Sequence, residues 1–309
     1  MNVHIAEQGQ GPLVLLLHGF PELWYSWRWQ LPALADAGFH AVAPDLRGYG
    51  RSDAPEPVES YSMRNMTADA VGILDALGAE RAVVVGHDWG APIAWHCALL
   101  YPDRFAAAVA LSVPYQPRGE AMPPTQAFRK IFGDNFFYIL YFQEPGVAEA
   151  EFEADVRRSL LLSLAGLSGN VSRDRALTPR TKRSKMFDDG AQPGPLPPWL
   201  SEADVDYYVA EFERTGFRGG LNRYRNMDRD WAELAQLQGA RVQQPALFIA
   251  GENDPVLGFT RMDGMKTHVP KLRKTVLLPG CGHWTQQERP SEVNRELIKF
   301  LRTLPLSEK

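Results

Sequence analysis

A glycine-flanked aspartate is the residue whose setting most directly predicts covalent chemistry. Asp88 is the middle residue of GHDWG (86–90), between the apolar run RAVVVG and a stretch with helical spacing. This is the spacing of the G-x-S-x-G nucleophile elbow, a sharp strand-to-helix turn, with aspartate in place of serine. A helix cap is the alternative role for Asp88, but capping does not explain the two glycines. We therefore expect Asp88 to be a nucleophile at the carboxyl end of a sheet, where ligand sites lie.

A base and an acid that orients it follow in the order expected after such an elbow, nucleophile, acid and histidine. Asp254 comes shortly after the apolar run PALFIAG, and His283 comes shortly after KTVLLP. We expect His283 to act as the base and Asp254 to orient it. The alternatives are a turn residue at Asp254, with Glu252 as its rival for the acid, and a packed loop histidine at His283.

The loop after the apolar run PLVLLLH is expected to help to bind an oxyanion. The backbone N–H groups of Phe20 in this loop and of Trp89 after the nucleophile would point at one oxygen. His18 and His87 lie in the same two loops. We expect both of these histidines to be structural.

The carboxylate nucleophile restricts the chemistry to substitution at saturated carbon. Attack by Asp88 would give an ester, and His283 can direct a water molecule onto the carbonyl of that ester. The departing group is then an epoxide oxygen, which needs a proton, or a halide, which needs only N–H donors. A tyrosine, with an ordinary pKa of about 10, can supply that proton. The spacing alone selects no pair among the tyrosines in or beside the middle of the chain, Tyr115, Tyr138, Tyr141, Tyr207, Tyr208 and Tyr224.

The elements around these residues alternate between strand and helix. Short apolar runs predict strands, and apolar residues at helical spacing predict helices. Such alternation is typical of an α/β fold with a mostly parallel sheet flanked by helices. The predicted strands cover 12–18, 39–44, 81–86, 105–112, 245–251 and 274–279, and the predicted helices cover 27–37, 62–77, 91–100 and 290–301.

The alternation stops in the middle of the chain, where we find helical stretches and loops but no strand signal. One long amphipathic helix is predicted over 147–165. We therefore predict a discontinuous core domain, 1–115 and 232–309, and an inserted all-helical cap domain, 116–231. Six basic residues between Arg173 and Lys185 could bind an anion, but a solvated surface loop is favoured because the net charge of the chain is −4.

Composition excludes several classes of protein. With 45% hydrophobic and 23% charged residues, the chain is typical of globular proteins rather than disordered or fibrous ones. The acidic balance predicts no nucleic-acid partner, and no apolar run reaches the roughly 18 residues of a membrane span. Two cysteines are too few for a disulfide framework or a structural zinc site. We expect a cytoplasmic protein without a metal or organic cofactor, and a homodimer is left open.

Beyond these residues, the chain resembles the soluble epoxide hydrolases, a family with the α/β-hydrolase fold, over essentially its whole length. Two of the motifs lie in the middle segment and resemble those that each supply a tyrosine for opening the epoxide ring. The motifs are HGFPE (18–22), DLRGYGRS (45–52), GHDWGA (86–91), YFQEPG (141–146), NRYRN (222–226) and GHWTQ (282–286).

The resemblance implies a residue-by-residue assignment and a reaction. Asp88 would be the nucleophile, His283 the base and Asp254 its orienting acid, while Tyr141 and Tyr224 would donate the proton. The substrates would be an apolar epoxide and water, the product a vicinal diol, and no cofactor is implied. Detoxification, lipid-mediator turnover and catabolism are all open as biological roles.

Two other functions share part of this signal. Haloalkane dehalogenases resemble the chain at GHDWG, but many have Asn where this chain has Phe20, and fluoroacetate dehalogenases tend to have Arg where it has Trp89. Neither family is expected to show both YFQEPG and NRYRN. A non-catalytic ligand-binding scaffold would be expected to have a broken triad. The combination of motifs therefore favours an epoxide hydrolase.

Overall fold

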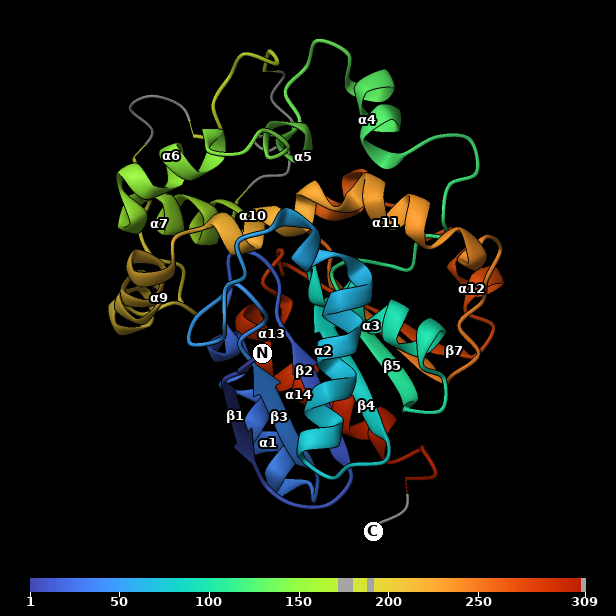
Figure 1. Cartoon of the computed structure of the whole chain (residues 1–309). Coiled ribbons are helices and arrows are strands. Elements are labelled where there is room, and N and C mark those ends of the chain that lie inside the picture. Colours follow the sequence, from blue (N-terminus) through green and yellow to red (C-terminus); the bar gives the residue numbers. More distant parts are fainter. Residues whose placement is uncertain (172–179, 188–191, 307–309) are drawn as a thin grey trace.

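Seven strands form one sheet that is parallel except at one edge. The computed structural model describes residues 1–171, 180–187 and 192–306 (Figure 1). The strand order is β1-β3-β2-β4-β5-β6-β7, and only β1 runs antiparallel to its neighbour. The six predicted strands are present with small shifts at their ends, and β1 was not predicted. The strands are β1 (Ile5–Gln8), β2 (Leu13–Leu17), β3 (His40–Pro44), β4 (Ala82–His87), β5 (Phe105–Leu111), β6 (Ala246–Gly251) and β7 (Leu272–Leu278).

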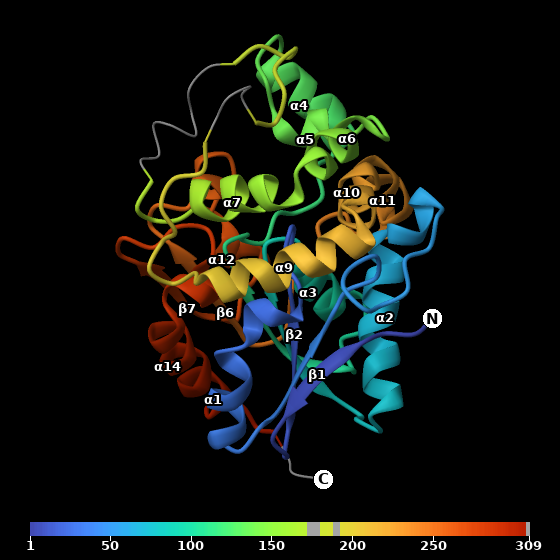
Figure 2. The same ribbon diagram turned by 90° about the vertical axis from the view of Figure 1, so that its left-hand side faces the viewer.

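Helices cover both faces of the sheet, which is why its central strands are apolar on both sides. Figure 2 shows the sheet from its edge, with α1 and α14 on one side and α2 on the other. The helices that flank the sheet are α1 (Gln30–Asp36), α2 (Met63–Ala76), α3 (Gly90–Leu100) and α14 (Pro290–Leu301). Strand β2 illustrates the two layers: Val14 and Leu16 pack with residues of α1 and α14, and Leu15 packs with residues of α2 and α3. The predicted α/β fold class is confirmed.

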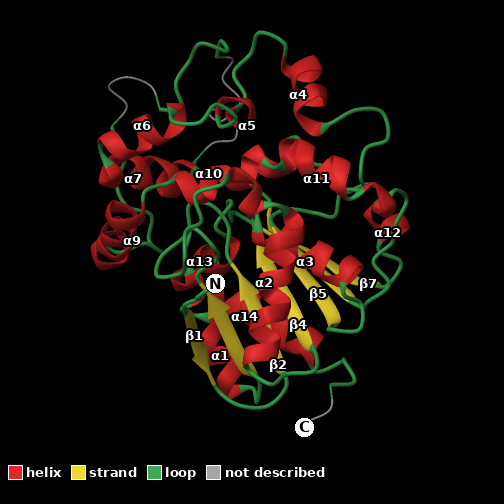
Figure 3. Ribbon diagram, viewed as in Figure 1, coloured by secondary structure: helices red, strands yellow, loops and turns green. Residues whose placement is uncertain are grey.

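The segment between β5 and β6 is helical in its described part and lies above the carboxyl ends of the parallel strands (Figure 3). Its described residues contain no strand, only an isolated bridge between Asn135 and Thr181. Its helices are α4 (Pro124–Phe132), α5 (Tyr138–Tyr141), α6 (Val147–Ala154), α7 (Val156–Gly166), α9 (Glu202–Thr215), α10 (Arg218–Arg225) and α11 (Met227–Glu233). Two short helices, α12 (Met265–His268) and α13 (Thr285–Glu288), follow in the last part of the chain.

The predicted helix over 147–165 is two helices, so that prediction was wrong. Helix α6 ends at Ala154, and the backbone of Asp155 is extended, with φ −154° and ψ 91°. The Asp155 side chain accepts a hydrogen bond from the N–H of Arg158 at 2.9 Å and so caps α7. Aspartate favours this arrangement over a helix interior, because its short side chain bonds the free backbone N–H groups of a helix start.

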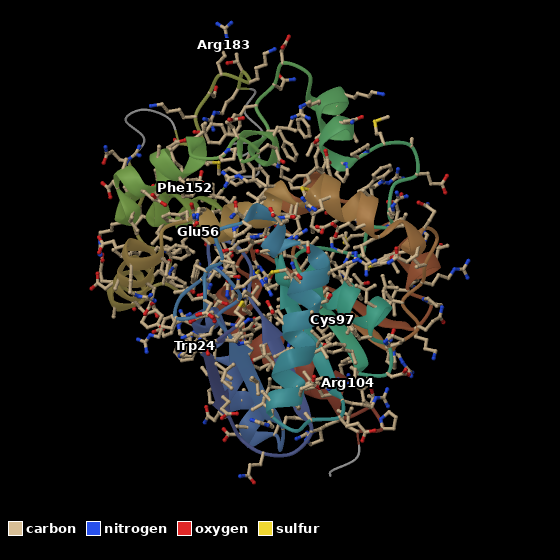
Figure 4. All side chains as sticks on the ribbon, viewed as in Figure 1. Trp24, Glu56, Cys97, Arg104, Phe152 and Arg183 are labelled. Carbon is tan, nitrogen blue, oxygen red and sulfur yellow. The ribbon has the colours of Figure 1, made fainter. Side chains whose placement is uncertain are left out.

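Part of the basic cluster falls in the described chain. Arg173 and Arg175 lie outside the described residues. Arg183 is exposed at the outer end of the segment above the sheet (Figure 4), and Lys182 forms an ion pair with Asp134. Within the described residues, no helix is both long enough and apolar enough to span a membrane.

The break at Asp155 gives a stability prediction. Asp155→Ala removes the side-chain acceptor at the start of α7 and should lower the free energy of unfolding by about 1 kcal/mol. Asp155→Asn keeps an acceptor and should lose much less. Urea unfolding followed by circular dichroism measures both variants, and equal stability of the alanine and asparagine variants would contradict the capping role.

Candidate active site

Asp88 lies on a tight turn that requires glycine two positions before it and two positions after it. It follows β4 directly and has a left-handed backbone with φ 47°. A Cβ atom added at Gly86 would lie 1.9 Å from the carbonyl oxygen of Gly90, and one at Gly90 would lie 2.0 Å from that of Leu17. Strand β4, helix α3 and strand β2 therefore approach each other too closely for any side chain at these positions. The turn holds Asp88 at the carboxyl end of the sheet, as the elbow motif predicts.

The structure brings Asp88, His283 and Asp254 together. The Nε2 atom of His283 is 3.5 Å from Oδ2 of Asp88, and its Nδ1 atom is 3.1 and 3.2 Å from the two carboxylate oxygens of Asp254. All three side chains are buried, Asp254 completely. Glu252, the alternative acid, is exposed. The geometry therefore agrees with Asp254 rather than Glu252 as the partner of His283.

The charges of these groups shift one another's proton affinity. Burial alone would lower the pKa of His283, but Asp254 and then Asp88 outweigh it and raise the pKa well above its ordinary value. Burial alone would raise the pKa of Asp88 and of Asp254, and in both the contact with His283 reverses the effect and lowers it. At neutral pH the site thus holds an imidazolium between two carboxylates.

One of the two expected oxyanion donors contacts the aspartate. The N–H of Phe20 donates a hydrogen bond to Oδ1 of Asp88 at 2.8 Å. Among the described residues, no hydrogen bond from the backbone N–H of Trp89 to Asp88 is found. The ring of Phe20 packs against those of Phe142 and Tyr224, with centroids 5.8 and 5.6 Å apart. The surroundings of the carboxylate are therefore aromatic as well as polar.

The two histidines that were expected to be structural both bond groups of the surrounding loops. His18 places Nδ1 2.8 Å from the carbonyl of Gly19, and its Nε2 accepts from the N–H of Leu46 at 3.0 Å, so its ring is neutral. Burial accordingly lowers the pKa of His18. His87 instead faces two groups that can only accept, the carboxylate of Glu22 and the carbonyl of His283, each at 2.7 Å. The ring of His87 therefore joins these two groups.

Glu22 is the buried carboxylate that faces His87, and its role was not predicted from the sequence. Burial alone would raise its pKa, but His87 reverses the effect and lowers it. Its carboxylate also accepts from the N–H of Gly19 at 2.9 Å and from the side-chain amides of Gln286 and Gln287 at 3.0 Å each. Glu22 and His87 therefore join the oxyanion loop to the loop that carries His283.

A second carboxylate joins the base loop to the segment above the sheet. Glu288 accepts hydrogen bonds from the backbone N–H groups of Gly169 at 2.9 Å and of Gly282 and Trp284 at 3.1 Å. The N–H of His283 donates to the carbonyl of Leu167, just after α7, at 2.9 Å. The backbone on either side of His283 is thus bound from both layers of the molecule.

The structure places Tyr224, but not Tyr141, at Asp88. The ring of Tyr224 lies 5.0 Å from that of Trp89, and its pKa is raised well above the ordinary value by burial and then by the charge of Asp88. The hydroxyl of Tyr141 instead donates to the carboxylate of Glu151 at 2.6 Å. The expected position of Tyr141 is therefore wrong, because its hydroxyl bonds a carboxylate of α6 rather than facing Asp88.

Tyr138, at the start of the same short helix, takes that position. Its ring is 6.0 Å from that of Tyr224, and burial, then the charges of Asp88 and Asp254, raise its pKa. Tyr138 was among the six tyrosines between which the spacing did not decide. The resemblance of the YFQEPG motif to that of the family favoured Tyr141 instead. The residue type was predictable, but the choice between two tyrosines three positions apart depends on how α5 is oriented.

One further polar residue at the site was not predicted. Ser112 follows β5 and is fully buried. Its hydroxyl oxygen lies 2.6 Å from Oδ2 of Asp254 and 3.0 Å from Nδ1 of His283. The position of Ser112 could have indicated this role, because it directly follows the strand that lies between the nucleophile strand and the acid strand. Within the described residues, no group of three or more His, Cys, Asp or Glu side chains could hold a metal ion.

Comparisons with known proteins give the family of the chain. The family model of the alpha/beta hydrolase fold matches residues 12–290. Epoxide hydrolase A of Mycobacterium tuberculosis is 52% identical over 309 residues, covering 99% of this chain and 96% of that protein. The crystal structure of Epoxide Hydrolase A from Mycobacterium thermoresistibile has a TM-score of 0.94 at 52% identity, with 99% and 96% of the two chains covered. An epoxide hydrolase from an endophytic Streptomyces has a TM-score of 0.93 at 51% identity, covering 97% and 92%.

The chain therefore belongs to the α/β-hydrolase fold family. Within that family it is an epoxide hydrolase, as the motifs predicted. The similarity is not limited to the motif GHDWG but extends over nearly the whole chain.

The charge arrangement predicts how His283 titrates. Asp88→Asn removes one of the two negative charges beside the ring, so the pKa of His283 should fall. Nitrogen-15 NMR of the histidine rings, assigned with His283→Gln, measures the change, and mass spectrometry checks that the asparagine has not reverted to aspartate. Glu252→Gln is the control and should leave the titration of His283 unchanged. An unchanged pKa in Asp88→Asn would show that Asp88 does not act on the base.

Proposed function

We propose that this epoxide hydrolase converts apolar epoxides to vicinal diols through a covalent ester on Asp88. The observation that carries the proposal is the surroundings of this one carboxylate. One oxygen accepts from the N–H of Phe20 and the other faces His283. The half-buried Tyr138 and the buried Tyr224 lie close enough for the charge of Asp88 to raise their pKa. The aromatic side chains around it support an apolar substrate.

In the first step, the hydroxyls of Tyr138 and Tyr224 hydrogen-bond the epoxide oxygen. Since Oδ1 of Asp88 is bound by Phe20, Oδ2 attacks a ring carbon from the side opposite the oxygen. The new C–O bond forms as the ring C–O bond breaks, and one tyrosine gives its proton to the departing oxygen. The product is a hydroxyalkyl ester of Asp88.

In the second step, the loss of the Asp88 charge changes His283. Only one carboxylate, Asp254, then favours the imidazolium, so the pKa of His283 falls and the ring gives up its proton, which passes through water to the tyrosinate left by the first step. The neutral ring can then act as a base. It takes a proton from a water molecule, which attacks the ester carbonyl, while the N–H groups of Phe20 and Trp89 hold the resulting oxyanion at Oδ1. The bond from the carbonyl carbon to Oδ2 breaks, and His283 gives its proton to Oδ2 of the leaving diol. The proton of the new Asp88 carboxyl group then passes to His283, which restores the carboxylate and the imidazolium.

The proposal includes the division of the chain into two domains. Residues 1–115 and 232–309 form the core, which carries Asp88, Asp254 and His283, and residues 116–231 form a helical cap, which carries both tyrosines. The support is that the proposed nucleophile and proton donors come from opposite layers of the molecule. The epoxide would bind between these layers. A cytoplasmic location is part of the proposal, and the buried free thiols of Cys97 and Cys281 support it.

Trapping the ester tests the covalent step. His283→Gln should still attack an aryl epoxide but hydrolyse the ester at least about 100-fold more slowly. Intact-protein mass spectrometry should then show an increase equal to the mass of the whole epoxide, and Asp88→Asn in the same background should abolish it. An increase equal to an alkyl group alone, obtained only with a haloalkane, would indicate a dehalogenase instead. No adduct from a panel of epoxides that the wild-type enzyme hydrolyses would overturn the proposal.

Phenylalanine variants test the choice of tyrosines. Tyr138→Phe combined with Tyr224→Phe removes both hydroxyls at Asp88 and should slow ring opening by more than about 100-fold. Tyr141→Phe is the matched control and should keep ring opening within about three-fold, because its hydroxyl bonds Glu151. Single-turnover kinetics measures the rate of ester formation. The opposite ranking, with loss only when Tyr141 is changed, would restore Tyr141 as the donor.

A further inference from the structure

Ser112 lies between the strand of the proposed nucleophile and the strand of the proposed acid. It follows β5, whose last residue, Leu111, pairs with His87 of β4 and with Ile249 of β6. The N–H of Ser112 donates to the carbonyl of Ile249 at 2.9 Å and so continues the sheet by one residue. The side chain is fully buried at the carboxyl end of the sheet.

The backbone of Ser112 is in a conformation that serine rarely adopts. Its φ is 70°, and the only other described residue besides glycine with positive φ is Asp88. Side chains are disfavoured there relative to glycine, and serine lacks the tolerance of asparagine and aspartate. A glycine would meet the backbone requirement without this cost. Residues held in such conformations cluster at functional sites, which directs attention to the serine hydroxyl.

The hydroxyl contacts both the acid and the base. Asp254 is ionised and can only accept, so the single hydrogen of Ser112 is donated to its Oδ2 at 2.6 Å. Toward His283 the serine oxygen is then an acceptor, 3.0 Å from Nδ1. The N–H at Nδ1 is shared among this oxygen and the two oxygens of Asp254, at 3.1 and 3.2 Å. Among the described residues, the carboxylate of Asp254 receives one further hydrogen bond, from the N–H of Val256 at 2.9 Å.

We infer that Ser112 is a positioning residue for ester hydrolysis, the second step of the reaction proposed above, on which this inference rests. Its hydroxyl holds the carboxylate of Asp254 in place and accepts part of the Nδ1–H bond, so Nε2 of His283 stays directed at Asp88 and the attacking water. Within the described residues, no hydrogen bond joins Ser112 to Asp88, and so the hydroxyl has no part in the attack on the epoxide. Its effect is therefore confined to the step in which His283 is the base.

This role has a distinct kinetic signature. When only ester hydrolysis slows, the ester accumulates, so kcat and KM fall together while kcat/KM, which reports ester formation, is unchanged. The loss of one hydrogen bond to a charged group corresponds to roughly a ten-fold effect. A residue that merely supported the sheet would instead affect both steps or neither.

Two substitutions separate the hydroxyl from the backbone. Ser112→Ala and Ser112→Gly both remove the hydroxyl, but only the glycine relieves the positive φ. Stopped-flow fluorescence of the wild-type and variant enzymes with an aryl epoxide, in single turnover, gives the rates of ester formation and decay. In both variants, decay should slow about ten-fold and formation should stay within about two-fold, while the glycine variant should unfold at a higher temperature than the alanine variant.

Three results would overturn the inference. They are unchanged ester decay in both variants, slow decay in the alanine variant alone, and equal slowing of formation and decay. The glycine variant keeps the test decisive if the alanine variant does not fold. Absence of an ester in the wild-type enzyme and in His283→Gln would instead count against the proposed two-step reaction, so the two failures can be told apart.

Discussion

The burial of alternating charges at the carboxyl end of the sheet is the constraint on which the rest of the site depends. Asp88, His283 and Asp254 form one series, and Glu22 with His87 forms another, and all five side chains are almost completely removed from water. A buried charge is costly unless it is paired and hydrogen-bonded. Each carboxylate here faces a histidine ring and accepts hydrogen bonds from N–H or O–H donors. The two series meet where His87 donates to the carbonyl of His283, so displacing one member leaves others uncompensated.

This requirement also explains how the segment above the sheet is attached. Because the backbone of His283 must hold its ring between two carboxylates, its N–H and carbonyl are each bound, to Leu167 and to His87. Glu288 binds backbone N–H groups on both sides of the interface. The end of α7 is therefore part of the support of the base. Tyr138 and Tyr224 reach the site from other helices of the same segment, α5 and α10.

The sequence was most informative where local chemistry determines structure. The glycines of GHDWG predicted the turn at Asp88 because no side chain fits there, and apolar runs predicted six of the seven strands. It was least informative where the outcome depends on orientation. Tyr138 and Tyr141 differ by three positions in one short helix, and only the packing of α5 decides which faces Asp88. The break at Asp155 was hidden because the apolar periodicity continues on both sides of it, and Ser112 is an ordinary residue until the sheet brings it to Asp254.

In the proposed reaction, the charge of Asp88 controls both the proton donors and the base. While Asp88 is ionised, it raises the pKa of Tyr138 and Tyr224, which keeps them protonated, and it holds His283 in its charged form. Attack on the epoxide converts the carboxylate to a neutral ester. The loss of this charge makes a tyrosinate less unfavourable, so the tyrosine gives up its proton when the departing oxygen needs it. It also lowers the pKa of His283, so the base becomes available once the ester has formed. The order of the two steps then follows from electrostatics.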